Sequence, residues 1–159
     1  MDKHGLDLET IEVIRALKYR YLRSVDLKLW DELADTFCVD VVAAYGSPSG
    51  GQPLNFSGRD EVVNYLRTAL GGSIGTLHQV TQPEITVTGD TATGVWAVRD
   101  TVIAAEYGVV IQGGAYYNDT YRREDGVWRI ASTGYQRIYE TMESQQGNER
   151  FTLTSFMWS

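Results

Sequence analysis

The sequence predicts a single α+β domain in which three N-terminal helices pack inside a strongly curved, mostly antiparallel sheet, forming a cone-shaped barrel with a pocket. Apolar residues recur at helical spacing through the first seventy residues, and after Gly72 the period changes to two. The strands predicted by this second pattern are longer than the usual length of about five to six residues, so they must bend to stay compact.

Three helices are expected before Gly72. Asp7 is positioned to cap the first, whose apolar stripe consists of Leu8, Ile11, Ile14, Leu17 and Tyr21. The second follows Asp26, with Leu29, Leu33 and Phe37 spaced by four. The segment Ser57–Asp60 resembles a capping box and opens the third helix, which Gly71 and Gly72 end. Between the last two helices, Gly46–Pro53 is typical of a mobile loop.

Long strands are expected after the third helix. One contains His78, and Ile85 and Val87 lead into a turn at residues 88–91. Three more run over about residues 92–104, 109–123 and 127–139, with Asp125-Gly126 as a strong hairpin signal between the last two. Gly113, Gly114 and Gly134 lie where bulges or bends would curve the sheet.

Composition and charge exclude several classes of function. The chain has 159 residues, 43% of them apolar and 22% charged, which is typical of one globular domain over residues 1–159. A net charge of −7 and the absence of a Lys/Arg run argue against nucleic acid and an anionic membrane as partners. Because Cys38 is the only cysteine and no signal peptide or membrane span is visible, we expect a cytoplasmic protein.

No motif for a cofactor or metal is present. The sequence has no phosphate-binding Gly-x-Gly-x-x-Gly or Gly-Lys-Ser/Thr loop and no Gly-x-Ser-x-Gly nucleophile elbow. Two histidines and one cysteine do not supply a His/Cys metal cluster. We therefore expect acid–base chemistry by a few polar residues without cofactor or metal.

Five residues are candidates for this chemistry, and each also has a structural interpretation. Asp26 suits a helix cap, and Tyr21 suits a core position. His78 is the one histidine in the structured region, and its ordinary pKa of about 6.5 suits proton transfer. Asp100 shares a strand face with Trp96, Val98 and Val102, where a carboxylate must be paired, functional or at the rim of the sheet.

Arg137 completes the candidate set. Period two places it on one strand face with Tyr135 and Tyr139. There it would pair with Asp100 or Asp26, bind a substrate oxygen, or remain in solvent at the strand end. Apolar walls that would bind rings are expected from Trp96, Val98, Tyr116 and Ile138.

The order of elements and several motifs resemble the SnoaL-like group of the nuclear-transport-factor-like cone superfamily, and within it the dehydratases of the scytalone dehydratase and bile-acid dehydratase type. The motifs are Tyr21-Leu-Arg-Ser-Val-Asp26, Trp30-Asp-Glu-Leu33, His78 before Pro83-Glu-Ile85, Thr93-Gly-Val-Trp96 with Asp100, Gly113-Gly-Ala-Tyr116, Asp125-Gly-Val-Trp128 and Thr133-Gly-Tyr-Gln-Arg-Ile-Tyr139. The resemblance covers about residues 8–140 and leaves 141–159 as a tail. The family's catalytic tyrosine, aspartate, histidine, second aspartate and arginine fall on Tyr21, Asp26, His78, Asp100 and Arg137.

The resemblance implies a dehydratase that removes water from a cyclic, mostly apolar hydroxylated substrate, such as a steroid-like or polycyclic ketone. His78 would be the base, oriented by Asp26, with Tyr21 polarising the carbonyl oxygen. The alternatives are a dehydrohalogenase or ketosteroid-isomerase-like enzyme on the same scaffold, or a non-catalytic ligand-binding cone. The apolar end of the tail, Phe151–Ser159, suits packing on a neighbouring subunit. The family likeness favours a homotrimer over a dimer.

Overall fold

The computed structural model describes residues 7–46 and 54–158, so residues 47–53 of the expected loop Gly46–Pro53 lie outside the described part. The elements follow in the order α1 (Leu8–Asp26), α2 (Trp30–Asp35), β1 (Phe37–Tyr45), β2 (Leu54–Ser57), α3 (Arg59–Leu70), β3 (Ile74–Thr88), β4 (Thr91–Ala104), a 3-10 turn η2 (Ala105–Tyr107), β5 (Val109–Glu124) and β6 (Val127–Ser144). Within the described residues, no helix is long and apolar enough to cross a membrane.

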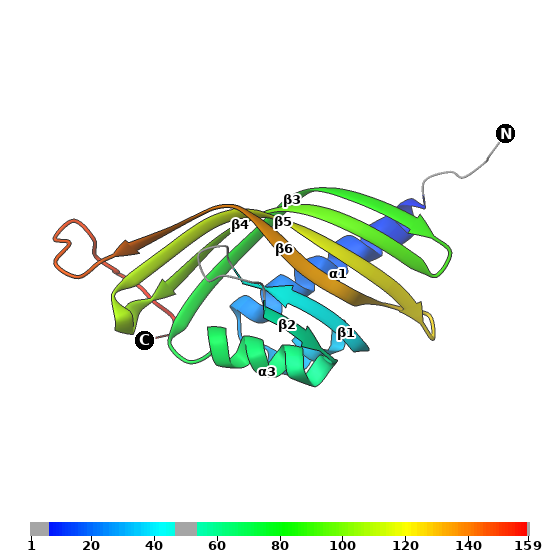
Figure 1. The fold of residues 1–159 in the computed structure, drawn as a ribbon, viewed down its shortest axis with the longest axis horizontal. Helices are drawn as coiled ribbons and strands as arrows, with labels where there is room; N and C mark the ends of the chain where they lie inside the picture. The colour runs from blue at the N-terminus through cyan, green and yellow to red at the C-terminus, as the bar shows by residue number, and fades with distance from the viewer. Residues whose placement is uncertain (1–6, 47–53, 159) are drawn as a thin grey trace.

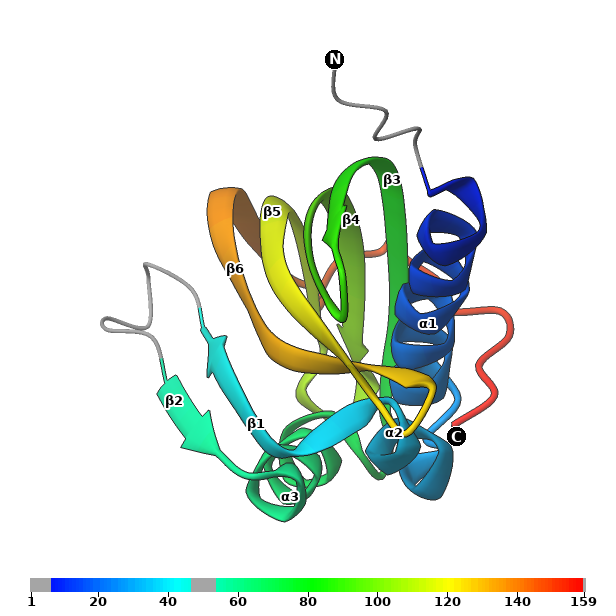
Figure 2. The same ribbon diagram turned by 90° about the vertical axis from the view of Figure 1, so that its right-hand side faces the viewer.

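The strands form one mixed six-stranded sheet in the order β2-β1-β6-β5-β4-β3. Only the β1–β6 pairing is parallel; the others are antiparallel. The long strands β3–β6 form a curved layer, and α1 runs along its concave side (Figure 1). Seen end-on, α1 lies beside the edge strand β3, while α2 and α3 close one end (Figure 2). The predicted α+β architecture, with helices packed against a curved sheet, is confirmed.

Two predictions for the segment before α3 are wrong: the second helix was expected to include Phe37, and no strand was expected between it and the third helix. The second helix ends at Asp35, and Phe37 begins β1 with its side chain fully buried. The spacing of Phe37 four residues after Leu33 suggested a helix, but the β-branched run that follows favours a strand. Strands β1 and β2 therefore separate α2 from α3. At the start of α3, Gly58 is the N-cap residue, and the backbone N–H of Ser57 donates to Glu61 Oε2 at 3.0 Å.

Register shifts curve the sheet where the glycine pattern predicted them and elsewhere. The β5–β6 register shifts between Gly114 and Ala115 and again after Thr120, and the β3–β4 register shifts between Thr81 and Glu84. The first shift leaves Ile138 without a partner in the register. Arg137 lines the inner face together with Tyr135, as alternation predicts, whereas Tyr139 beyond the shift is exposed. The expectation that Tyr139 shares the face of Arg137 is thus wrong, because a bulge reverses the alternation.

The core lies between α1 and the concave face of the sheet. Asp7 caps α1 as predicted, accepting from the backbone N–H of Thr10 at 3.0 Å. The buried face of the helix includes Ile14, Leu17 and Tyr21, while Leu8 at its start is exposed. Trp96 in β4 and Ile130 in β6 are fully buried on the sheet side. This packing holds α1 against the strands that carry the other candidate site residues.

The C-terminal segment folds back onto its own chain. The rings of Phe156 and Trp158 lie over Gly75 at the start of β3, where a larger residue would collide with Phe156. Lys28 Nζ lies 3.7 Å from the Trp158 ring centroid. Phe151 and Met157 remain exposed, so the packing of this tail on a neighbouring subunit stays a prediction.

Candidate active site

A pocket opens on the concave side of the sheet, between the helices α1 and α3 and the strands β1 and β3–β6. Its volume is about 110 Å³, several times the roughly 10–15 Å³ that one buried water needs. Its apolar walls include Val25, Leu66, Val98 and Val102. Its polar side chains are Tyr21, Tyr45, Tyr65, His78, Asp100, Tyr117, Tyr135 and Arg137.

Asp26, the last residue of α1, is bound to β3 through three contacts. Its Oδ1 lies 2.6 Å from Nδ1 of His78 and accepts from the hydroxyl of Thr76 at 2.8 Å. Its Oδ2 accepts from the backbone N–H of His78 at 2.9 Å. Both side chains are nearly buried, with 11% of Asp26 and 12% of His78 exposed. The carboxylate therefore has a fixed orientation toward the imidazole.

This geometry determines how the imidazole faces the pocket. A carboxylate only accepts hydrogen bonds, so Nδ1 of His78 carries the proton that it donates to Asp26. In the neutral ring Nε2 is then the unprotonated nitrogen, and it is available to a ligand in the pocket that His78 lines. The expected contact of about 3.2 Å or less between Asp26 and His78 is present.

Asp100 and Arg137 form a second pair in the same pocket. Two parallel hydrogen bonds join them, from Nη1 to Oδ1 at 2.5 Å and from Nη2 to Oδ2 at 2.8 Å. Glu140 Oε2 lies 3.3 Å from Nε of the same guanidinium. These bonds, Asp100 first, raise the pKa of Arg137, so it is a permanent cation. Of the partners left open by the sequence, Arg137 takes Asp100 rather than Asp26.

Gly113 makes room for this pair, a role that sequence reasoning missed. It faces Asp100 across β4 and β5, and the Arg137 side chain crosses directly over it. A Cβ on Gly113 would overlap the guanidinium and lie 3.2 Å from Asp100 Oδ1. The sequence indicated a bend at this glycine; its side-chain-free surface is what allows the ion pair to form.

Tyrosines from five elements form the remaining polar wall. The hydroxyls of Tyr21 in α1 and Tyr45 in β1 are 3.0 Å apart. Burial, with added effects from Tyr117 and Tyr45, raises the pKa of Tyr21 well above its ordinary value. The phenol therefore stays protonated and is able to donate a hydrogen bond. Tyr65, Tyr117 and Tyr135 complete this wall.

Three of the four expected substrate-binding residues lie outside this pocket. Val98 lines it, but Trp96 is fully buried in the core, where its indole N–H donates to the Tyr121 hydroxyl at 2.9 Å. Tyr116 is 45% exposed and Ile138 68% exposed, on the outer face of the sheet. Tyr116 was assigned to the wrong face because the sequence alone did not give the parity of β5. Ile138 was assigned wrongly because it follows Arg137 directly, so alternation places it on the face opposite to that inward-pointing residue.

The sequence reasoning instead overlooked Tyr45, Tyr65, Tyr117 and Tyr135. The alternation of β5 contained a signal for one of them, since Tyr117 has the same parity as Gly113 and Ala115. Because Gly113 pairs with Asp100, whose side chain lies in the pocket, the residues of β5 that alternate with Gly113 face the inside of the sheet. Tyr45 had no such signal, because β1 itself was not predicted.

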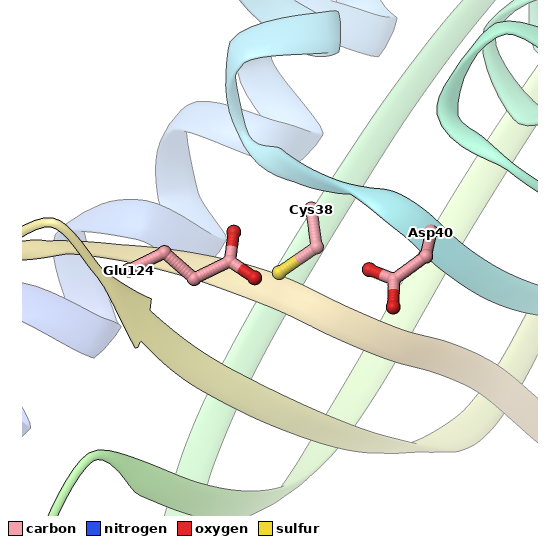
Figure 3. A group of neighbouring side chains, drawn as sticks. All are labelled: Cys38, Asp40 and Glu124. Carbon is pink, nitrogen blue, oxygen red and sulfur yellow. The ribbon is translucent and has the colours of Figure 1, made fainter.

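One group outside the pocket has the residue types of a metal site. Cys38, Asp40 and Glu124 lie together near the start of β1 and the end of β5, with the sulfur between the two carboxylates (Figure 3). Arg122 Nη2 already binds both carboxylates, at 2.6 Å from Asp40 and 2.5 Å from Glu124. Burial raises the pKa of the Cys38 thiol, which disfavours the thiolate that a metal needs. The group is an arginine-centred ion cluster.

The fold and the pocket together define a cone-shaped α+β protein of the nuclear-transport-factor-like type. Residues 6–134 match the SnoaL-like domain family, which is most of the 159 residues. The chain belongs to this family, as the resemblance of its motifs suggested.

Solved structures share this fold over most of their length. A putative scytalone dehydratase from Novosphingobium aromaticivorans aligns with a TM-score of 0.75 and 21% identity, covering 85% of this chain and 88% of that one. A type 2 hexachlorocyclohexane dehydrochlorinase, LinA, gives 0.76 and 22%, covering 94% and 97%. A nuclear-transport-factor-like protein of unknown function from Pseudomonas putida gives 0.66 and 20%, covering 83% and 89%. At these identities the likeness is one of fold.

Proposed function

We propose that the protein is a cofactor-independent lyase that eliminates water from a cyclic, mostly apolar hydroxylated ketone of steroid-like or polycyclic type. The observation that supports this most directly is the 2.6 Å contact between Asp26 and Nδ1 of His78, whose ring lines the pocket. Such a pair is suited to removing a proton from carbon next to, or conjugated with, a carbonyl group. The family and the names of the dehydratase and dehydrochlorinase structures agree with elimination chemistry.

In the proposed reaction Nε2 of His78 takes the acidic C–H proton. The C–H electron pair moves into the carbonyl system, and Asp26 stabilises the imidazolium that forms. Tyr21 donates a hydrogen bond to the carbonyl oxygen as it gains enolate charge. The electron pair then moves back to form the new C=C bond as the C–O bond breaks. The leaving hydroxide takes the proton from His78 and departs as water.

Asp100 and Arg137 have a different role in this scheme. Their side chains are 6% and 8% exposed and joined by two hydrogen bonds, so neither is a free proton acceptor. We propose that the pair orders the leaving hydroxyl, with the carboxylate accepting its hydrogen bond. General acid–base catalysis of this kind contributes about 10²–10⁴-fold, which makes a metal or nucleotide unnecessary for the step.

The test is a screen of hydroxylated steroid-like and polycyclic ketones, followed by mass spectrometry for the loss of one water. Wild-type turnover should fall by about 10²-fold or more in His78→Ala, while the melting temperature stays close to that of wild type. If His78 is only a core residue, the variant should melt earlier and keep its turnover per folded molecule. A folded His78→Ala protein with wild-type turnover would refute the mechanism.

Elimination of halide is a second candidate, and one feature of the pocket favours testing it. A halide leaves without taking up a proton. The elimination then needs only Nε2 of His78, oriented by Asp26, to accept the C–H proton, and the Asp100–Arg137 pair is not needed to order a leaving hydroxyl. Asp100→Asn should therefore impair dehydration and leave any dehydrohalogenation of a chlorinated ring largely intact. Equal losses on both substrate classes would contradict this division of roles.

A further inference from the structure

A buried ion pair in the core takes no part in the mechanism described so far. Lys18 Nζ of α1 lies 2.7 Å from Asp119 Oδ2 of β5, and neither side chain has any exposed surface. Burial lowers the pKa of Lys18, and Asp119 opposes that change. A fully buried pair of this kind is often no more stabilising than a well-packed apolar pair of the same volume. Stability alone thus gives little reason for the charges.

Asp119 is held in place by further hydrogen bonds. Its Oδ1 accepts from the hydroxyl of Thr133 at 2.7 Å, and its Oδ2 accepts from the hydroxyl of Tyr121 at 2.8 Å. Tyr121 in turn accepts from the indole N–H of Trp96. Each carboxylate oxygen thereby has a hydroxyl donor, and Oδ2 has the ammonium as well. The negative end of the ion pair is fixed on the side of the sheet.

The positive end faces the tyrosine wall of the pocket. Lys18 Nζ lies 3.5 Å from the ring centroid of Tyr117 and 4.8 Å from that of Tyr21. Those two rings are packed edge to face, with centroids 6.4 Å apart, and both line the pocket. Lys18 precedes Tyr21 by one helical turn, and Asp119 follows Tyr117 by one strand period. The same two elements therefore carry both the ion pair and the two phenols.

We propose that Lys18 and Asp119 are positioning residues that act through Tyr117 and Tyr21 on the acid–base pocket, an inference that rests on the proposed function. The ammonium draws electron density from the two ring faces, which makes each phenol a stronger hydrogen-bond donor to a substrate oxygen. The ion pair also holds α1, and with it Tyr21 and Asp26, at a fixed distance from β5. Tyr117 thereby becomes a second donor beside Tyr21.

A charge-free replacement separates this role from stability. Lys18→Met alone leaves a buried carboxylate without its cation, so its melting temperature should fall strongly. In Lys18→Met/Asp119→Asn both charges are gone and the amide still bonds Thr133 and Tyr121, so much of that loss should be recovered. Arg122→Met is the matched control, because it removes a cation from the ion cluster outside the pocket.

The kinetic arm measures turnover and KM separately. The double variant should lose about tenfold in kcat, the scale of a desolvated cation–π contact, with little change in KM. The control Arg122→Met should keep kcat and KM near those of wild type. In a Tyr21→Phe/Tyr117→Phe background the same double change should cost little more, because the hydroxyls through which it acts are absent. A stable double variant with wild-type kcat, or an undiminished loss in that background, would overturn the proposal.

The second arm needs no substrate, so it remains decisive if the proposed reaction is wrong. A 3-fluorotyrosine placed at position 21 or 117 gives one ¹⁹F signal whose position and width report the ring environment. Lys18→Met/Asp119→Asn should shift or broaden both signals, and Arg122→Met should leave them unchanged. Unchanged signals in the double variant would show that the ion pair does not hold these tyrosines, whatever the enzyme's substrate.

Discussion

His78 in β3 and Asp100 in β4 are direct partners in the antiparallel register, yet each side chain is bound to a different element. His78 is held by Asp26 of α1, and Asp100 is held by Arg137 of β6. Residues directly opposite on one face have Cβ atoms about 4.5–5.5 Å apart. Two hydrogen-bonded pairs therefore lie side by side in one pocket, an arrangement that agrees with the proposed removal of a proton and a leaving group from neighbouring carbons.

Asp26→Asn should reduce turnover by about 10²-fold or more, on the scale of lost general-base catalysis. The amide can donate to Nδ1 of His78 and so favour the wrong tautomer, and it cannot neutralise an imidazolium. Kinetics on any substrate found by the screen would check this, and an Asp26→Glu variant that regains part of the activity would support it. Full activity in Asp26→Asn would contradict the proposed orientation of the base.

Tyr21→Phe should lower kcat more than it raises KM. The phenol is fully buried and stays protonated, so its hydrogen bond gains most when negative charge develops on the substrate oxygen. The measurement is a comparison of kcat and KM in the two proteins. A change confined to KM would mean that Tyr21 only binds substrate.

Gly113→Ala should abolish the Asp100–Arg137 geometry and most of the activity. The added methyl group overlaps the guanidinium of Arg137, whose Cζ also lies over the ring of Tyr135, 5.0 Å from its centroid. Turnover and a crystal structure of the variant would show whether the two hydrogen bonds are lost.

Gly114→Ala is the matched control for that change. Its methyl group would meet the ring of Tyr139, which is exposed and free to turn away. We expect this variant to keep its activity, because the neighbouring glycines face opposite sides of the sheet. Equal losses in the two variants would instead indicate that any side chain in this part of β5 is harmful.

Stability should decline steeply above about pH 10, the ordinary tyrosine pKa. Burial raises the pKa of Tyr21, Tyr45 and Tyr117, so the folded chain keeps protons that the unfolded chain loses. With fewer protons bound in the unfolded state, the free energy of unfolding falls as pH rises. Each such group contributes up to about 1.4 kcal/mol per pH unit.

Urea unfolding of Tyr45→Phe between pH 8 and 11 would test this. This variant lacks one of the tyrosines with a raised pKa, so its free energy of unfolding should fall less steeply with pH, by up to about 1.4 kcal/mol per pH unit. Tyr107→Phe, at a 67% exposed position, should keep the wild-type slope. The opposite contribution of Lys18 is common to all three proteins and cancels in the comparison. An unchanged slope in Tyr45→Phe would show that its hydroxyl ionises alike in both states.

The protein should form an oligomer, for which we propose a homotrimer. Leu77, Tyr116 and Ile138 are exposed, and each is next in sequence to a residue that lines the pocket, so they lie on the outer face of the sheet. Exposed apolar groups of this kind are typical of subunit contacts. Sedimentation equilibrium at micromolar concentration should give a mass well above 17.8 kDa. A monomer alone would refute the assembly, and a dimer would refute the trimer.

The sequence by itself determined the class of fold, the starts of the long strands β4–β6 and the candidate site residues, although β6 runs to Ser144 rather than ending near residue 139. Helical spacing before Gly72 and period two after it are local properties, so they can be recognised without knowing which segments pack against one another. Alternation alone placed Asp100 on the inner face of β4, where it is 5% exposed. Asp26 and His78 were candidates from their residue types, and the motif likeness paired them, a contact that is present.

Only the tertiary structure decided which of these residues meet. The bulge at Ile138 turns Tyr139 away from the face of Arg137, and the absence of a side chain at Gly113 lets Arg137 reach Asp100. The unexpected strand β1 brings Tyr45 to Tyr21, and the packing of α1 on the concave side of the sheet buries Lys18 against Asp119. Such contacts join residues far apart in the chain and depend on register and strand parity, which a single-residue slip would reverse. Local periodicity carries no information about that register, because it is set by packing of the whole domain.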